Sequence, residues 1–426
     1  MPRAAAGQPA NDVVELRQTS SGQKSWWYSI DALMKHAELG LDQRNDAHIA
    51  WSACDGLSQR RSWPEWRGGE VYVRARERMP VIPPSAGDVS LDEKVAFLSR
   101  ATSYAFPAWP VTRLETHMSW VFLAGDEVFK LKKPLQFPYL NFSTLARREA
   151  ACRAELALNH QLASDVYKAV VPIRRCSHGL TIGKGGDVVD WLVVMRRLDW
   201  RQTLACALKK GRVATWQLDR LVSTLAQFYR HAGAIFVSGE THLHGWQRSL
   251  AYNRSILLDP RLRLPAGLVR RVDGAQRRFL AERSALIADR VRRRQIVDGH
   301  GDLRAEHIWL GDPVRIIDRL EFNRDLRAVD PFDEIAFLCV ECERLGCAWA
   351  GEYIKRRARV TLSGGLSDEL FTFYRCHRAT LRARLTIAHL LEPNARTPEK
   401  WPQLAITYLR LAADDARRLH RMLRTP

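Results

Sequence analysis

The decisive stretch of this sequence is GHGDLRAEHIWLGDPVRIIDRLEFN, residues 299–323. The runs IWL and VRIID within it are short and apolar, which predicts a two-stranded hairpin ending at Asp318. Asp302 lies in the polar loop before that hairpin. A carboxylate in a loop can orient a hydroxyl group and accept its proton, and a second carboxylate at a strand end can hold Mg2+ against nucleotide phosphates. The stretch therefore predicts the two acids that phosphoryl transfer requires.

A cluster of positive charge lies in the run VFKLKK, residues 128–133. Side chains alternate between the two faces of a strand, so Lys130 and Lys132 share one face and Lys133 points to the other. Lysine supplies only 12 of the 66 basic residues of the chain, and three of them are here. Their retention favours a need for compact ammonium groups. A solvated strand edge protected by lysine is the alternative.

The order of the periodic segments predicts an α+β protein with a bilobal fold, consisting of a small β-rich N-lobe and a large helical C-lobe. Residues 89–200 form the predicted N-lobe, with a capped helix at 90–104, a long amphipathic helix at 142–163 and several strand-like runs. Those runs occupy 119–125, 127–133, 169–173, 179–183 and 190–198. Residues 201–426 form the predicted C-lobe, which contains the catalytic hairpin. Its helical runs are 215–233, 268–294, 332–345, 368–391 and 401–423.

The first 88 residues lack sustained periodicity and end in the linker VIPPSAG. We predict a poorly ordered or weakly structured extension there. Met79 lies just before the linker, which raises the hypothesis that residues 1–78 are an over-extended gene start.

Composition excludes several classes of protein. The 426 residues are 46% hydrophobic and 27% charged, which is typical of globular chains and not of disordered, collagen-like or coiled-coil ones. No run of 18 apolar residues is present, so no membrane span is predicted, and an N-terminus without an apolar core favours a cytoplasmic protein. A net charge of +19 attracts anionic partners such as nucleotides, phosphorylated metabolites or nucleic acid. A basic surface without a dedicated partner is the alternative.

Three segments carry a family resemblance: HGDLRAEHIWL (300–310), IIDRLEFN (316–323) and VDPFDEIAFL (329–338). They resemble the aminoglycoside-phosphotransferase-like kinases, whose fold is that of protein kinases. The segments 115–134, 141–159 and 373–385 are more closely similar to bacterial proteins in which such a domain is sometimes fused to an ATP-binding P-loop domain. The resemblance extends from Val89 to Leu411. The sequence contains no G-x-x-x-x-G-K-[ST] motif, so the P-loop half is not expected in it.

The resemblance implies an ATP-dependent phosphotransferase with Mg2+ as its second cofactor. By motif, Asp302 falls on the catalytic base and Asp318 on the metal-binding aspartate. Lys132 is the first candidate for the phosphate-binding lysine and Lys130 the alternative. Glu155 falls on the helix partner of that lysine, with the glutamate at position 149 as runner-up.

Further residues follow from the same resemblance. Thr116 and Ser119 lie in the loop that would cover the phosphates. The segment from Val194 to Leu198, with Met195 and Arg196, corresponds to the hinge against which adenine packs. Asp333 corresponds to a buried carboxylate that braces the catalytic loop.

His307 departs from the family pattern, which has asparagine there as a second Mg2+ ligand. Mg2+ prefers oxygen ligands, so an imidazole is a poor substitute. Glu306, His307 or Glu321 could compensate, or one metal ion could suffice. A pseudokinase or nucleotide-binding scaffold, with RNA among its possible partners, is the competing hypothesis.

The remaining sequence patterns are less specific for a function. Cys339, Cys342 and Cys347 fit a buried helix face better than a metal site, and His242 with His244 fits a loop better than a metal pair. Arginines at 375, 378, 382 and 384 could grip an anionic acceptor or form a solvated helix face. A chain of net charge +19 is a poor binder of polycations, so the expected acceptor is a hydroxylated small molecule that is neutral or anionic.

Overall fold

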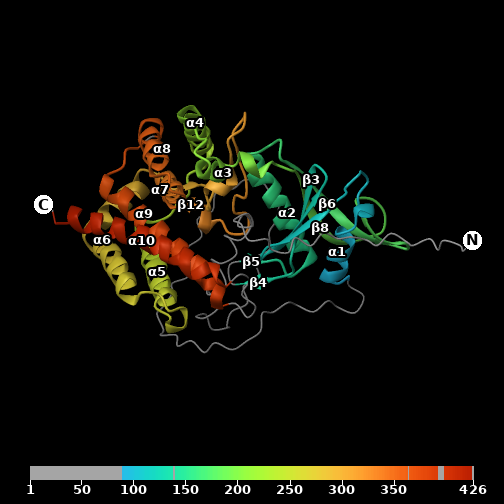
Figure 1. The fold of residues 1–426 in the computed structure, drawn as a ribbon, viewed down its shortest axis with the longest axis horizontal. Coiled ribbons are helices and arrows are strands. Elements are labelled where there is room, and N and C mark those ends of the chain that lie inside the picture. Colours follow the sequence, from blue (N-terminus) through green and yellow to red (C-terminus); the bar gives the residue numbers. More distant parts are fainter. Residues whose placement is uncertain (1–88, 138–139, 363, 392–397, 425–426) are drawn as a thin grey trace, which may run out of the picture.

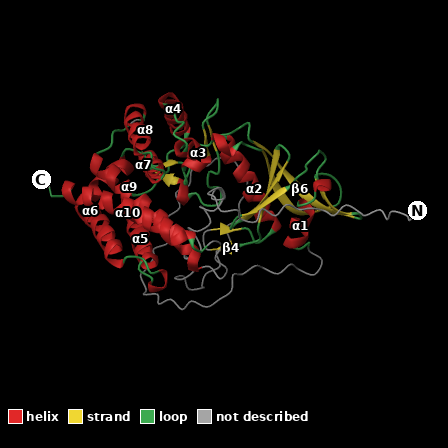
Figure 2. Ribbon diagram, viewed as in Figure 1, coloured by secondary structure: helices red, strands yellow, loops and turns green. Residues whose placement is uncertain are grey.

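The computed structural model describes residues 89–137, 140–362, 364–391 and 398–424. The strands gather at one end of the molecule and the long helices at the other (Figures 1 and 2). The predicted α+β class and its two-lobed arrangement are therefore confirmed. The prediction for residues 1–88 lies outside the described residues.

The β-lobe is built on one antiparallel sheet of six strands in the order β1-β2-β3-β8-β6-β7. The strands are β1 (Thr112–Glu115), β2 (Ser119–Ala124), β3 (Glu127–Lys132), β6 (Tyr167–Cys176), β7 (Gly179–Ile182) and β8 (Asp187–Arg196). β2 and β3 form a hairpin whose turn contains Gly125 at φ 56°, a conformation that glycine adopts without strain. A second, two-stranded sheet joins β4 (Gln136–Phe137) to β5 (Leu140–Asn141).

Two helices of the β-lobe are tied to the sheet through one buried carboxylate. α1 (Leu91–Leu98) begins with a capping box made by Ser90 and Glu93, as its sequence predicts. α2 (Leu145–His160) is capped by the Thr144 hydroxyl. Asp190 of β8 lies between them and accepts from Lys94 Nζ at 2.8 Å and from Arg148 Nε at 2.7 Å.

Short strands fill the junction between the lobes. The predicted hairpin is present as β10 (Ile308–Trp309) paired with β11 (Arg315–Ile316). β9 (Val297–Asp298) pairs with β12 (Ala328–Val329) just beside it. The loop with Asp302 therefore lies between two small sheets, because β9 precedes it and β10 follows it.

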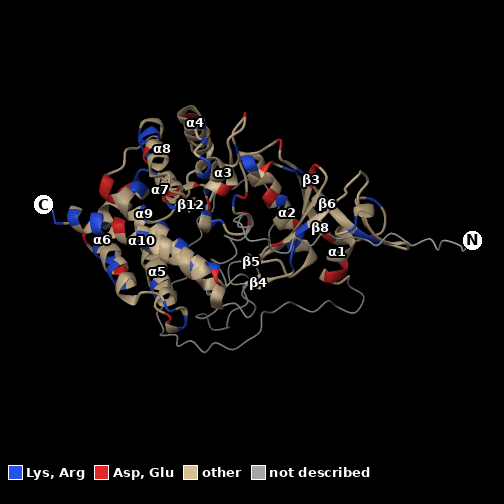
Figure 3. Cartoon of the chain, viewed as in Figure 1, with Lys and Arg blue, Asp and Glu red and all other residues tan. Residues whose placement is uncertain are grey.

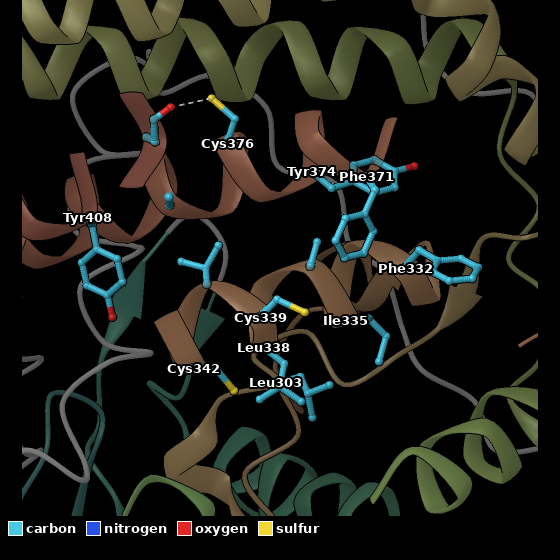
Figure 4. Close-up of a cluster of buried hydrophobic side chains, with 14 of the residues drawn as sticks. Leu303, Phe332, Ile335, Leu338, Cys339, Cys342, Phe371, Tyr374, Cys376 and Tyr408 are labelled. Carbon is cyan, nitrogen blue, oxygen red and sulfur yellow. Dashed lines mark hydrogen bonds between the residues drawn. The ribbon is translucent and has the colours of Figure 1, made fainter. Parts of the chain in front are cut away.

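Helices make up most of the second lobe. They are α3 (Leu204–Lys209), α4 (Thr215–His231), α5 (Gly239–Leu257), α6 (Ala266–Arg292), α7 (Pro331–Arg344), α8 (Ala348–Thr361), α9 (Asp368–Ala388) and α10 (Lys400–Met422). α7 and α9 pack through apolar residues in this lobe, and Leu303 from the Asp302 loop lies beside Leu338 of α7 (Figure 4). The loop is thus anchored in the largest core of the molecule.

The helices decide two of the remaining sequence predictions. Cys339 and Cys342 are buried in α7, which confirms the helix-face prediction for both. The prediction of a loop around His242 and His244 is wrong, because both residues lie within α5 and His242 Nε2 accepts from Trp246 Nε1 at 3.2 Å.

Candidate active site

The glutamate of the site lies on α2 and is held by two lysines of β3. Glu155 Oε1 is 2.7 Å from Lys130 Nζ, and Glu155 Oε2 is 2.6 Å from Lys132 Nζ. Both lysines therefore occupy one face of the strand, as alternation predicts. Burial alone would raise the pKa of Glu155, but Lys130 and Lys132 outweigh it and lower the pKa. Glu149, the runner-up, instead pairs with Arg153 on the outer side of α2.

Lys130 reaches across the junction toward the hairpin. Its Nζ lies 3.3 Å from Asp318 Oδ1, so one ammonium group joins α2 to the end of the hairpin. Burial alone would raise the pKa of Asp318, but Lys130 and then His307 lower it to about 2. Asp318 has a φ of 64°, an uncommon value for a residue with a side chain, and its N–H donates to the Tyr167 hydroxyl at 3.2 Å. Tyr167 supports this backbone conformation from the β-lobe.

Lys132 has different surroundings. Its side chain is 1% exposed, and its Nζ lies 2.5 Å from Glu321 Oε1 as well as close to Glu155. The two acids outweigh the effect of burial and raise the pKa of Lys132. Lys132, the first candidate on sequence grounds, is therefore enclosed by protein, whereas Lys130 is the lysine beside Asp318. Lys133 lies elsewhere and donates to the Thr116 carbonyl oxygen at 2.7 Å.

The Asp302 loop is held by a carboxylate of α7. Glu334 Oε2 accepts from His300 N–H at 3.0 Å, and Glu334 Oε1 accepts from Gly301 N–H at 2.5 Å. Gly301 has a φ of 89°, and a Cβ there would lie 2.8 Å from Leu320 Cδ1, so the turn requires glycine.

The prediction that Asp333 braces this loop is wrong by one position. Asp333 binds Arg378 of α9 at 2.5 Å, while the next residue, Glu334, contacts the loop. Neighbouring residues on a helix point about 100° apart. The sequence DE therefore leaves open which of the two acids faces the loop.

His307 stands between the two aspartates. Its Nδ1 lies 3.0 Å from the Asp302 carbonyl oxygen, and its Nε2 lies 3.7 Å from Asp318 Oδ2. The ring is only 4% exposed. His307 therefore brings the predicted base and the predicted metal ligand into one site.

An apolar cluster lies beside these charged groups. Met195 of β8 and Val121 of β2 pack with Trp309 and Ile317, which flank the hairpin. These four side chains are buried against one another, beside the charged groups and between the sheet and the hairpin. Val194 does not contribute to it, because its side chain packs in the core on the other face of the sheet.

Three other residues that were predicted to contact the nucleotide bind groups within the protein instead. Arg196 pairs with Asp165 at 2.5 Å. The Thr116 hydroxyl donates to the Ser119 carbonyl oxygen and accepts from Ser119 N–H, both at 2.9 Å. Thr116 and Ser119 thus close the turn between β1 and β2, and both are buried. These hydrogen bonds fix the main-chain conformation of the turn.

The residues fit a cation that is shared with a phosphate group. Asp318 offers a carboxylate oxygen that Lys130 leaves available, and His307 offers Nε2 beside it. Within the described ranges no group of three or more His, Cys, Asp or Glu residues could hold a metal ion by itself. Mg2+ commonly takes one or two protein ligands and completes its shell with phosphate oxygens and water.

Three arginines of α9 are inside the protein, so of the two alternatives for this helix, the solvated face is wrong. Arg378, Arg382 and Arg384 are each less than a tenth exposed. Arg384 lies over the ring of Tyr252 at 4.3 Å, and burial lowers its pKa to about 10. Charged residues of both signs are spread over both lobes (Figure 3).

Sequence reasoning missed three residues of this site. Glu334 binds the loop, Tyr167 supports Asp318, and Arg319 donates to the Gly299 carbonyl oxygen at 2.8 Å. Tyr167 begins β6 directly after a turn, and nothing in its strand pattern reveals a partner 151 residues away. A signal existed only for Glu334, as the neighbour of Asp333.

Comparisons with known proteins give relatives without an assigned activity. Uncharacterized proteins of Mycobacterium bovis and of two Mycobacterium tuberculosis strains are 33% identical over 278 residues, which is 64% of this chain and 53% of theirs. The chain thus spans about half the length of the curated relatives it matches. No family model matches the sequence.

Solved structures give looser likenesses. A choline/ethanolamine kinase family protein from Mesorhizobium loti has a TM-score of 0.44 at 19% identity and covers 79% of this chain and 95% of its own. Choline kinase LicA from Streptococcus pneumoniae has a TM-score of 0.45 at 13% identity, and the match covers 77% of this chain and 100% of the other. The aminoglycoside phosphotransferase APH(3'')-Id from Streptomyces rimosus has a TM-score of 0.40 at 15% identity, and the match covers 68% of this chain and 98% of the other. The chain itself has the two lobes, the lysine–glutamate pair and the two loop acids that the sequence resemblance implied.

Proposed function

We propose that this protein is an ATP-dependent phosphotransferase that moves the γ-phosphoryl group to a hydroxyl group. The observation that carries the proposal is the contact of Lys130 Nζ with both Glu155 and Asp318, at 2.7 and 3.3 Å. A lysine held between a helix glutamate and a metal-site aspartate is the arrangement that positions nucleotide phosphates in kinases.

The β-lobe, residues 89–200 in this proposal, would hold the nucleotide. Lys130 would bind phosphate oxygens in place of one of its present carboxylate contacts, and Glu155 would keep its ammonium group in position. Lys132 would hold Glu155 from the other side. Met195 and Ile317 would pack against the base.

The helical lobe, residues 201–426, would supply the acids. Asp302 would orient the acceptor hydroxyl and take its proton, since a loop carboxylate anchored by Leu303 and Glu334 has a fixed position. Asp318 and His307 would hold Mg2+ or a related ion, which when bound neutralises charge on the phosphoryl group.

The proposed acceptor is a hydroxylated small molecule that is not a polycation. Arg304, Arg378 and Arg382 are buried within the segment that follows Asp302 and in the facing helix α9. Burial alone would lower the pKa values of Arg378 and Arg382, but nearby acidic groups, Asp302 among them, raise these values and keep both side chains charged. The net charge of +19 on the whole chain disfavours a polycationic acceptor.

The alternative proposal is a pseudokinase that binds nucleotide without transferring phosphate. The observation that favours it is the imidazole of His307, which stands where a kinase of this kind would carry an oxygen ligand. Intact Lys130, Asp302 and Asp318 favour the enzyme.

Nucleotide binding by thermal shift, with and without Mg2+, tests the shared part of both proposals. ATP with Mg2+ at about 100 times its Kd should raise Tm by several degrees, because ligand binding stabilises the folded state by about 2.7 kcal/mol. Asp318→Asn should remove the Mg2+-dependent part. Asp325→Asn, an exposed acid beyond the hairpin, is the matched control. No shift at millimolar ATP would contradict both proposals, and binding without phosphoryl transfer from radiolabelled ATP to any hydroxylated metabolite pool would favour the pseudokinase.

A further inference from the structure

The tautomer of the His307 ring follows from the atom that its Nδ1 faces. Nδ1 lies 3.0 Å from the Asp302 carbonyl oxygen, which can only accept a hydrogen bond. Nδ1 therefore carries a hydrogen and donates it. In a neutral imidazole the other nitrogen, Nε2, then has its lone pair free.

That lone pair faces a carboxylate. Nε2 is 3.7 Å from Asp318 Oδ2, while Asp318 Oδ1 is the atom that contacts Lys130. Two electron-rich atoms at this separation repel each other unless a proton on Nε2 or a metal ion lies between them. Two atoms that each bind one divalent ion at about 2.1 Å lie roughly 3–4 Å apart. The observed distance falls in that interval.

The ring is also held in place around this position. His307 is 4% exposed, and its ring stacks on that of His300, with the centroids 6.1 Å apart. A donated Nδ1–H from a metal-bound histidine to a backbone carbonyl oxygen is the usual support for such a ligand. Asp302 thus contributes its carbonyl oxygen to orient His307, apart from any role of its side chain.

We propose that His307 Nε2 and Asp318 Oδ2 bind one divalent ion, and that the nitrogen ligand makes this site prefer a transition-metal ion such as Mn2+ to Mg2+. The inference rests on the proposed nucleotide site, since phosphate oxygens and water would complete the coordination. Mg2+ demands oxygen ligands, whereas first-row transition metals accept imidazole.

Pulsed electron paramagnetic resonance of bound Mn2+ tests this directly. The full chain is loaded with Mn2+ and a non-hydrolysable ATP analogue, and electron spin echo envelope modulation is recorded. The wild type should show coupling of Mn2+ to a 14N nucleus, and incorporation of 15N-labelled histidine should replace that pattern by the 15N one. His307→Asn, whose amide offers oxygen, should lose the histidine coupling. It should also shift the Mn2+/Mg2+ competition ratio by roughly tenfold toward Mg2+. His231→Asn, at the exposed end of α4, should change neither.

The outcomes separate the two levels of the proposal. One result would overturn this inference alone. In that result, Asp318→Asn releases the bound Mn2+, but the wild type shows no coupling of Mn2+ to histidine nitrogen. Failure of both Mn2+ and the nucleotide analogue to bind the wild type would overturn the proposed function together with it. The 15N-histidine experiment uses the wild-type protein. The inference can therefore be tested even if His307→Asn does not fold.

Discussion

Two lysines on β3 share one carboxylate but differ in their second partner. Lys130 contacts Glu155 and Asp318, and Lys132 contacts Glu155 and Glu321. Sequence alternation places both on one face, but it cannot say which one meets the hairpin, because that depends on how the lobes pack. The geometry therefore assigns phosphate binding to Lys130 and support of Glu155 to Lys132 within the proposed function.

Lys130→Met should weaken MgATP binding by about tenfold or more, because a phosphate-binding charge is lost from the site. Its effect on unfolding should be smaller than that of Lys132→Met. Isothermal titration with ATP measures the first quantity and urea denaturation the second. Lys133→Met, outside the cluster, should leave ATP affinity unchanged.

Lys132→Met should lower the free energy of unfolding by about 3 kcal/mol, because it leaves Glu155 and Glu321 buried without this cation. Burial raises the pKa of Glu321 against the pull of Lys132, so loss of the lysine should leave Glu321 protonated. The double variant Lys132→Met/Glu321→Gln should regain part of the stability. A Lys132→Met protein as stable as the wild type would contradict the assignment.

The free energy of unfolding should decrease as the pH is lowered, because His377 is buried in the folded protein. Burial, and then Arg378 and Arg384, lower the pKa of His377 from 6.5 to about 3. Between these values the unfolded chain binds a proton that the folded chain does not, so stability is lost as pH falls from 6.5 toward 3. His377→Asn should remove about 1.4 kcal/mol per pH unit from the slope of unfolding free energy between pH 6 and 5. Urea denaturation at both pH values measures it, and an unchanged slope would show that His377 is not held neutral.

At the scale of elements, the carboxylate of Glu334 connects α7 to the Asp302 loop. Glu334→Gln replaces one of its two acceptors by a donor, which cannot accept from both His300 and Gly301. We expect about 2 kcal/mol of destabilisation and faster amide hydrogen exchange at these two residues. Asp333→Asn should leave their exchange unchanged, since Asp333 binds α9 instead. Equal effects of the two variants would contradict the assignment.

The elements that sequence predicts best are those with strong local signals. β2, β3 and the start of α1 follow from alternation, the Gly125 turn and the Ser90 cap. α8 was missed because the face that it buries consists largely of small residues, Ala350, Gly351 and Ala358, which give little hydrophobic periodicity. α5 was missed because its first turns are polar and contain glycine. In the site, residue types and chain order were predictable, whereas Tyr167 and Glu334 act through contacts that only the packed fold creates.

At the scale of the whole molecule, polar contacts between α2 and the segment after the hairpin join the lobes. Asn159 is fully buried, its Oδ1 accepts from Arg319 N–H at 2.8 Å, and its Nδ2 donates to the Arg319 carbonyl oxygen at 3.3 Å. We expect the described lobes of the wild type to unfold in one calorimetric transition. Asn159→Ala should separate a lower transition for the β-lobe, because buried partners are left unpaired.

The control for that experiment is Asn323→Ala, which removes a hydrogen bond to Asp325 N–H within the helical lobe. It should keep the single transition. One unchanged transition in Asn159→Ala would mean that the apolar contacts of Met195 with Trp309 and Ile317 are enough to couple the lobes.

The candidate site lies in a chain whose described helices are all too short or too polar to cross a bilayer. Its contacts come from elements and loops of both lobes. Such a site exists only when the lobes are assembled. Under the proposed function, Asn159→Ala should therefore weaken ATP binding although Asn159 itself would not contact the nucleotide.

The two ion pairs of Glu155, with Lys130 and with Lys132, have a consequence for regulation. Many kinases are switched off by swinging the glutamate-bearing helix outward, which breaks its single ion pair with lysine. Here an outward swing of α2 would break two buried ion pairs at once, at a cost of several kcal/mol. A regulator acting on α2 would have to supply that energy. Under the proposed function, we therefore expect α2 to keep this position whether or not nucleotide is bound, so that the rate would be set by the supply of substrate.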